Sequence, residues 1–184
     1  MDTKPVAATT PALVVNPEKL KKLLSKIENE QNLLLGIGYG VSATLLCAAA
    51  WAVITVITNY QIGWMAIGLA FAVGFAVRFG GQGINKLYGA IGAVLALVGC
   101  LLGNYLSYVG VIAKLKSMGY FETLVAINPA KIPEIFGLAF QPMDVLFYAM
   151  ALYFGYKYAL RRLTPKELQT VSDPAPAPVS SPAK

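Results

Sequence analysis

Long runs of apolar residues without charge dominate the chain, and two of them are neighbours in its middle. No charged residue occurs between Gln61 and Val77, or between Leu87 and Ala113. A helix rises about 1.5 Å per residue, so each run is long enough to cross a hydrocarbon layer about 30 Å thick. The pattern predicts two membrane-spanning helices that form an antiparallel hairpin.

A further apolar run lies on each side of this hairpin. Leu33 to Thr58 is long and uncharged, whereas Val145 to Leu160 is shorter and rich in Phe and Tyr. We therefore predict an all-α membrane protein with four transmembrane helices, at about residues 33–58, 61–78, 87–113 and 143–160.

An amphipathic helix is predicted before the first span, over residues 16–31. Asn16 is a suitable N-cap, and Pro17 and Glu18 favour the first helical turn. Apolar residues recur with helical spacing, and lysines occupy the other faces: Leu20, Leu23, Leu24 and Ile27 against Lys19, Lys21, Lys22 and Lys26. Such a helix docks on lipid headgroups or on its own bundle, or alternatively on a dedicated partner.

The remaining segments lack a long periodic pattern. Residues 1–15 and 163–184 contain Pro, Ala, Thr and Ser and are predicted to be disordered. The connection 114–142 mixes polar and apolar residues, and it contains one Asn-Pro pair and one Ile-Pro pair. It predicts two short helices in the membrane interface, with a re-entrant segment as the alternative.

Composition supports a membrane protein and argues against catalysis. Apolar residues make up 57% of the chain and charged residues only 13%, about half the usual share of a soluble domain. Histidine, the commonest general base and transition-metal ligand, is absent from the sequence. The two cysteines, Cys47 and Cys100, lie within apolar runs. We therefore expect a protein that is not an enzyme, with no metal or other cofactor and no nucleic-acid partner.

Basic residues are distributed unevenly between the predicted loops. Of the 15 Lys and Arg residues, three lie in the connection 114–142, and the other twelve lie near the termini or in the turn 78–86. By the positive-inside rule, both termini and this turn are cytoplasmic, and 114–142 is periplasmic.

The turn between the second and third spans is the first candidate site. Its glycines are expected to supply positive φ angles, and their N–H groups can form a nest for an anion between two basic residues. The candidate lipid or anion ligands are Arg78, Gly80, Gly81, Gly83 and Lys86. The alternative is that Arg78 only snorkels toward the membrane surface and the glycines only allow the turn.

A strip of small residues on the third span is the second candidate site. Gly92, Ala96, Gly99, Gly103 and Asn104 share one face, and we expect the closest helix crossing at Gly99 and Gly103. The strip is predicted to meet either the second span, through Ala66, Ala70 and Gly74, or a second copy of the protein. Asn104 either bonds to a neighbouring helix or contributes to a solute site.

Several of these motifs occur together in a recognisable order. Residues 76–83 (Ala-Val-Arg-Phe-Gly-Gly-Gln-Gly), the pairs Gly89 with Gly92 and Gly99 with Gly103, and residues 144–148 and 155–157 follow one another. Over about half of its length, the chain thus resembles a group of uncharacterised bacterial four-span inner-membrane proteins. The resemblance implies four-span architecture and the bacterial inner membrane, but no activity.

Two functional hypotheses follow. The first is a membrane assembly or sensor subunit that packs with itself or with partners. Its basic cytoplasmic segments would contact anionic membrane lipids or a cytosolic protein. The second is a small channel or carrier formed by a homo-oligomer, because a single bundle of four helices encloses little room.

Overall fold

The computed structural model describes residues 13–133, 137 and 142–174 of the 184-residue chain. The chain divides into two compact units. The helical unit comprises residues 30–161, and the flanking unit comprises residues 1–29 and 162–184. The described structure is almost entirely α-helical, with one two-stranded sheet in the flanking unit.

Four long helices form the helical unit, and their bounds lie close to the four predicted segments. In chain order its elements are α2 (Leu33–Thr58), α3 (Met65–Gly81), α4 (Lys86–Lys116), α5 (Tyr120–Ala126), the 3-10 turn η1 (Pro129–Lys131) and α7 (Pro142–Ala159). The helix α5 lies in the connection where short helices were predicted. Residues 134–136 and 138–141 of that connection lie outside the described residues.

By length and composition, two of the described helices can cross a membrane, namely α2 and α4. The helix α3 is apolar but has only 17 residues. The helix α7 has 18 residues and carries Asp144 and Lys157 within it. On this criterion alone, the structure supports two spans rather than the four that the sequence predicted.

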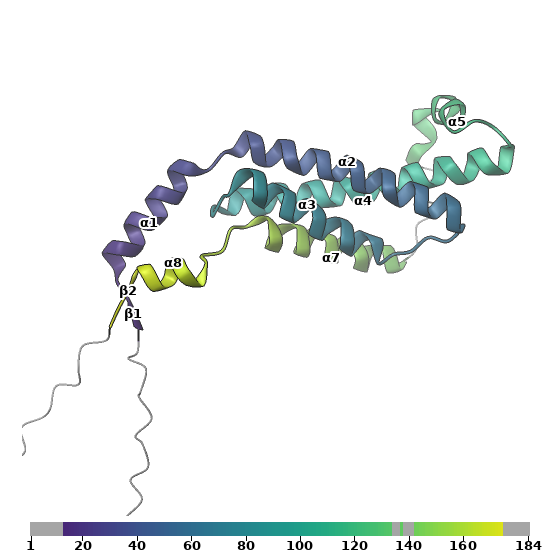
Figure 1. The fold of residues 1–184 in the computed structure, drawn as a ribbon. Coiled ribbons are helices and arrows are strands. Elements are labelled where there is room, and N and C mark those ends of the chain that lie inside the picture. The colour runs from purple at the N-terminus through teal and green to yellow at the C-terminus, as the bar shows by residue number, and fades with distance from the viewer. Residues whose placement is uncertain (1–12, 134–136, 138–141, 175–184) are drawn as a thin grey trace, which may run out of the picture. The chain divides into compact units, whose positions relative to one another are not determined.

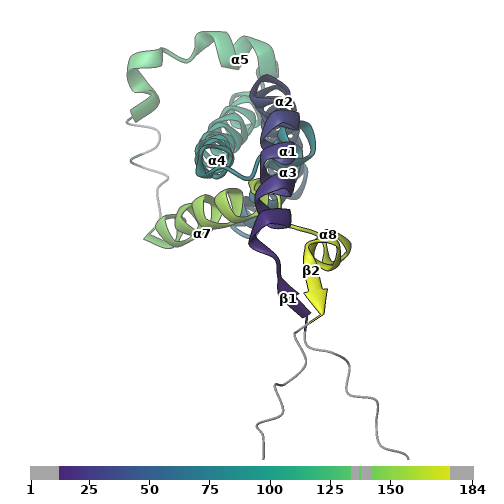
Figure 2. The ribbon, with the colours of Figure 1, turned by 90° about the vertical axis from the view of Figure 1, so that its left-hand side faces the viewer.

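The helices alternate in direction, as Figures 1 and 2 show. The start of α2 meets the end of α3, and the start of α4 meets the end of α7, so α2 and α4 run one way and α3 and α7 the other. Both α2 and α7 pack against α3 and α4. The main apolar core lies where the four helices meet and contains Trp51, Leu69, Val73, Ala96, Cys100 and Ala151.

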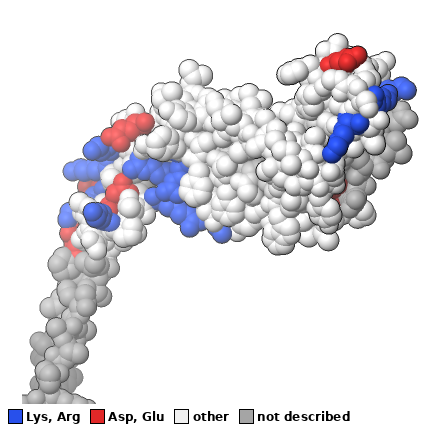
Figure 3. Space-filling view, turned by 45° about the vertical axis from the view of Figure 1, so that its right-hand side comes forward, with Lys and Arg blue, Asp and Glu red and all other residues white. Residues whose placement is uncertain are grey.

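Charged side chains in the helical unit gather at its two ends. The face drawn in Figure 3 is white over most of the long helices, with Lys and Arg toward each end. The exposed surface between these ends includes large apolar side chains, among them Leu46, Val53, Phe75 and Val94. An apolar surface of this kind is typical of helices that face lipid.

The flanking unit contains structure where the sequence predicted disorder. The strands β1 (Leu13–Val15) and β2 (Ser172–Pro174) pair antiparallel, with Val14 opposite Asp173, and the helix α8 (Pro165–Thr170) precedes β2. Backbone bonding between residues far apart in sequence stabilises these short strands, and no local pattern reveals such a pairing. Residues 1–12 and 175–184 lie outside the described residues.

The amphipathic helix of the flanking unit matches its prediction closely. The helix α1 (Pro17–Glu30) begins after Asn16, whose side-chain oxygen accepts hydrogen bonds from the backbone N–H groups of Glu18 and Lys19. Its apolar stripe is less exposed than its lysines, and Ile27 is buried. Its N-terminus also joins the C-terminal flank, because Lys19 and Asn16 both bond to the carboxylate of Asp173.

Candidate functional site

The turn between α3 and α4, residues 78–86, is built differently from the predicted anion nest. Gly80 and Gly81 belong to the last turn of α3, so their N–H groups point back along the helix instead of outward. The positive φ angle falls on Gln82, at 49°, and no described glycine has a positive φ. The predicted positive φ angles of the glycines are therefore wrong, and anion binding at this turn stays a prediction.

The glycines of this turn allow close packing instead. A Cβ added to Gly80 would lie 2.6 Å from the carbonyl oxygen of Leu35, and one added to Gly81 would lie 2.5 Å from the ring of Tyr88. At Gly83 the added Cβ would lie only 1.9 Å from the same ring. Tyr88 is buried against Gly81 and Gly83, so a side chain at either of these two positions would overlap with the tyrosine ring.

The carbonyl groups of the turn bind the two chain segments that lead into and out of the helical unit. The Gly81 carbonyl accepts a hydrogen bond of 3.1 Å from the N–H of Asn32, just before α2. The Gly83 carbonyl accepts one of 2.9 Å from the N–H of Arg161, just after α7. The Arg161 guanidinium also donates to the side chain of Gln82. The turn thus ties the first and last long helices together at one end.

The two basic residues predicted for the anion site lie at this same end. Arg78 is half-buried in the last turn of α3 and borders a shallow apolar groove formed by Phe75, Ala76 and Phe79. Lys86 is exposed at the start of α4. Their charges remain available to a membrane surface.

The small-residue strip on α4 is buried, but it does not face a single neighbour. Gly92 approaches Gly155 and Ala159 of α7, Gly99 approaches Leu69 of α3 and Thr44 of α2, and Gly103 approaches Trp51 of α2. Different parts of this face contact different helices, because α4 packs against α7, α3 and α2 at successive positions along its length. The predicted contact with α3 therefore holds only at Gly99, and the alternative contact with a second copy stays a prediction.

The closest backbone approach on this strip is at Gly92, not at Gly99 or Gly103 as predicted. A Cβ on Gly92 would lie 2.5 Å from the Gly155 carbonyl oxygen, and one on Gly155 would lie 2.6 Å from the Gly92 carbonyl oxygen. At Gly99 and Gly103 the nearest atoms belong to side chains. Ala96, whose side chain also faces Gly155, completes this contact with α7.

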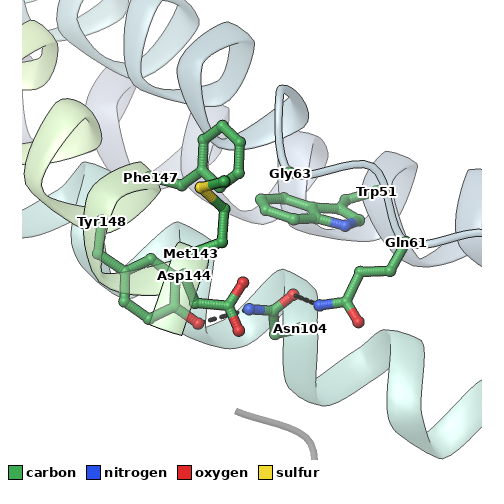
Figure 4. A pocket seen from close by; sticks show the side chains of 8 residues that line it. All are labelled: Trp51, Gln61, Gly63, Asn104, Met143, Asp144, Phe147 and Tyr148. Carbon is green, nitrogen blue, oxygen red and sulfur yellow. Dashed lines mark hydrogen bonds between the residues drawn. The ribbon is translucent and has the colours of Figure 1, made fainter. Parts of the chain in front are cut away.

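A cavity of about 110 Å³ lies at the opposite end of the helical unit from the glycine turn. We call it the polar pocket. It is lined by Trp51 of α2, Gln61 and Gly63 of the connection between α2 and α3, Asn104 of α4, and Met143, Asp144, Phe147 and Tyr148 of α7. Residues from four separate segments therefore meet there (Figure 4).

A chain of hydrogen bonds crosses the polar pocket. The amide nitrogen of Gln61 donates to the Asn104 side-chain oxygen at 3.0 Å, and the Asn104 amide nitrogen donates to the hydroxyl of Tyr148. Asn104 is only 2% exposed, so both of its polar atoms need such partners. The prediction for Asn104 left open a helix contact or a solute site; the structure gives it a partner on α7 and places it at a cavity.

Trp51 contributes a buried donor to the pocket. Its side chain is 2% exposed, and its indole nitrogen has no hydrogen-bond acceptor among the described residues. Figure 4 shows this nitrogen on the edge of the ring that faces Gln61 and Asn104. A buried N–H without an acceptor is unfavourable, so this donor is suited to a bound molecule.

A second cavity of about 240 Å³ adjoins the first at Gln61. Thr55 lines it, and the Thr55 hydroxyl is likewise buried without a hydrogen-bond partner in the described part of the chain. At the outer edge, Asn59 accepts a hydrogen bond of 2.7 Å from Lys114. Polar groups therefore continue from the pocket along the seam between α2 and α4 to the end of α2.

Of the residues at the polar pocket, the sequence analysis identified only Asn104. Trp51, Gln61, Asp144 and Tyr148 were missed because their meeting depends on the packing of distant segments. The available signal was weak: Gln61 and Asp144 are polar residues at the starts of two apolar runs.

No cluster of three potential metal ligands occurs among the described residues. Comparisons with known protein families, curated proteins and solved structures gave no match to this chain.

Proposed function

We propose that the chain is a four-span protein of the bacterial inner membrane that acts as a non-enzymatic assembly or sensor subunit. The observation that carries the proposal is the contrast between the two ends of the helical unit. One end ties together the segments leading to both flanks, and the other holds a polar pocket. Such a protein could respond to a ligand on one side of the membrane and contact partners on the other.

The lengths of α3 and α7 are compatible with two additional spans. With 17 and 18 residues, they extend about 26 and 27 Å, near the lower limit for crossing a bilayer. Both pack beside α2 and α4, so a membrane that surrounds those two helices would also surround these. Asp144 lies in the first turn of α7 and Lys157 in its last, close to the water on either side.

The hydrogen bonds at the glycine turn support placing both flanks on one side of the membrane. Asn32 and Arg161 bond to carbonyl groups only two residues apart, so the chain enters and leaves the helical unit at the same end. Basic residues at this end include Arg78, Lys86 and Lys157, and the positive-inside rule makes it the cytoplasmic end.

Basic cytoplasmic segments suggest what the protein would contact. The exposed lysines of α1 and the charges of Arg78 and Lys86 would attract anionic membrane lipids or an acidic cytosolic protein. The exposed apolar faces of the long helices would face lipid, a second copy or another membrane protein.

A channel or carrier is the less supported alternative. The space between the four helices is filled by side chains such as Leu69, Val73 and Cys100, so a single copy offers no continuous pore. A pore would have to form between copies. Purification from native membranes separates the two functions. A stoichiometric protein partner supports the subunit, and a homo-oligomer that dissipates an ion gradient in vesicles supports the channel.

Fusions to a reporter enzyme that is active only outside the cytoplasm test the membrane arrangement. We expect no reporter activity after Arg162 and full activity near Ser117, at the end of α4. Activity at Arg162 would overturn the proposed orientation. Equal activity at both positions would contradict a single topology.

Native mass spectrometry tests the lipid contact. Replacing Arg78 and Lys86 with Gln should reduce the anionic phospholipid that remains bound. Replacing Lys114 and Lys116, which lie at the end of α4, is the matched control and should do less. Equal losses from both pairs would mean that only general surface charge attracts lipid.

A further inference from the structure

We infer that the polar pocket binds a small primary amine that also carries an oxygen acceptor, a short amino alcohol being the simplest example. Its oxygen accepts a hydrogen bond from the indole N–H of Trp51, and its ammonium group faces the carboxylate of Asp144. The inference deepens the proposed sensor function by naming the ligand class, and it depends on that function only for the side from which the ligand arrives.

The requirement for an acceptor comes from Trp51. Its donor is almost fully enclosed, and the neighbouring amides already bond to each other and to Tyr148. Rotating the Asn104 amide to face the indole would break both of its hydrogen bonds. No described residue bonds to this donor, so a molecule in the cavity can supply the acceptor, either a water or a ligand with an oxygen atom.

The preference for an amine comes from the other wall of the pocket. Figure 4 shows the carboxylate of Asp144 beside the Asn104 amide and the Tyr148 hydroxyl, across the pocket from Trp51. A carboxylate attracts a cation and repels an anion. The rings of Trp51 and Phe147 also border the cavity, and aromatic faces attract ammonium groups.

The size of the cavity suits a small ligand. The volume is about 110 Å³, and one water needs about 10–15 Å³ of cavity measured in this way, so a ligand of several non-hydrogen atoms can enter. Ethanolamine has this size, with its nitrogen and oxygen separated by two carbons. Met143 and Phe147 line the apolar side of the cavity.

Intrinsic fluorescence offers a direct test because the chain has only two tryptophans. The variant Trp64→Phe removes the exposed one and leaves Trp51 as the sole reporter. The purified full-length variant, in detergent and an amine-free buffer, is titrated with ethanolamine. We expect a saturable change in the Trp51 emission, because the environment of its N–H group changes.

Chemically matched probes then separate the two halves of the ligand. Ethylamine lacks the oxygen, ethylene glycol lacks the amine, and glycolate carries the opposite charge. Each should bind at least about tenfold more weakly than ethanolamine, with both halves of the site contributing. Equal responses to ethanolamine and ethylene glycol, or to ethanolamine and sodium chloride, would overturn the inference.

Substitutions at the pocket provide the matched controls. Asp144→Asn should weaken ethanolamine binding at least about tenfold, whereas Glu122→Gln, which removes a carboxylate from α5 in the connection that follows α4, should leave it unchanged. In Trp51→Phe, the thermal stabilisation by ethanolamine should be reduced. If ethanolamine neither shifts the emission nor raises the melting temperature of the parent, the cavity holds only water and the inference is wrong.

Sidedness distinguishes failure of this inference from failure of the proposed function. In sealed proteoliposomes of known orientation, ethanolamine should act only from the side opposite the termini. Binding from the side of the termini would leave the pocket assignment intact and overturn the proposed topology. No binding, together with the expected reporter pattern, would overturn the ligand and leave the topology intact.

Discussion

The glycine turn and the polar pocket lie at opposite ends of the same four helices, and they are built on opposite principles. At the turn, glycines bring backbones and the ring of Tyr88 into contact, and the turn carbonyls at Gly81 and Gly83 accept hydrogen bonds. At the pocket, larger side chains leave a cavity and a buried donor without an acceptor. The comparison separates an end suited to holding the fold from an end suited to binding.

This difference changes where the function should be sought. The glycine-rich segment is the more conspicuous feature of the sequence, yet its small residues serve close packing. The pocket is assembled from ordinary Trp, Gln, Asn, Asp and Tyr residues that become a site only through their arrangement. Substitutions near the turn should therefore mainly change stability, and substitutions at the pocket should mainly change binding.

The largest loss of stability is expected for Gly92→Ala. The added methyl group would collide with the Gly155 carbonyl, and a backbone atom in a packed helix cannot move away cheaply. Overpacking of this kind should lower the free energy of unfolding by about 1–3 kcal/mol. Reversible unfolding in mixed detergent measures the change.

Gly38→Ala is the matched control for that substitution. Gly38 lies within α2, and an added Cβ would meet no atom within 4 Å. Alanine should therefore leave stability unchanged or raise it by up to about 1 kcal/mol. Similar losses for both substitutions would show that helix propensity, not the contact with α7, controls the result.

A smaller loss is expected for Gly83→Ala, because the obstacle there is a side chain. The new methyl group would displace the ring of Tyr88, at a cost of about 1–2 kcal/mol. In a Tyr88→Leu background the same substitution should cost less, since the ring is gone. A double-mutant cycle measures this coupling, and a coupling energy of zero would contradict the proposed contact.

The helix positions themselves were largely predictable from sequence. Uncharged runs and their flanking polar residues located all four long helices, and α2 has the predicted bounds of 33 and 58. The main shift is in α3, which begins at Met65 instead of near residue 61 and continues through Gly80 to Gly81. Glycine usually weakens a helix, but here the absence of a side chain permits the contact with α2.

The flanks and the pocket could not be predicted in the same way. The pairing of β1 with β2 joins residues about 160 positions apart, and the pocket joins four segments. One local signal was overlooked: Thr164 and Glu167 form a capping box, with Pro165 at the first helical position, which together favour the helix α8.

At the polar pocket, Tyr148→Phe should have a modest effect on stability. It removes the hydroxyl that accepts a hydrogen bond from Asn104, a loss of about 0.5–1.5 kcal/mol that water in the cavity partly offsets. Tyr153→Phe, at an exposed position on the same helix, is the control and should change stability less. If Tyr148→Phe lowered the free energy of unfolding as much as Gly92→Ala does, the two ends would not differ in how much they contribute to stability.

The smallest effect concerns the flanking unit, in which an exposed charge contact joins Lys19 of α1 to Asp173 of β2. Hydrogen bonds from Lys19 and then Asn16 lower the pKa of Asp173 below its ordinary value of 3.8. A lowered pKa in the folded state means that this contact stabilises the flanks fully above the unfolded pKa and is lost as the pH falls through the folded pKa. The hydrogen bonds to Gly81 and Gly83 contain no group that titrates there, so only the flanking contact should respond to acid.

A carbon NMR titration of the Asp173 carboxyl group measures this difference. Lys19→Gln should return the pKa of Asp173 toward its ordinary value, and by more than Asn16→Ala does, because the Lys19 bond is the larger cause. High salt should act in the same direction, since both partners of the ion pair are substantially exposed. If the pKa of Asp173 is unchanged in the Lys19 variant, the ion pair contributes nothing, and the strand pairing and the hydrogen bonds of Asn16 hold the flanks together.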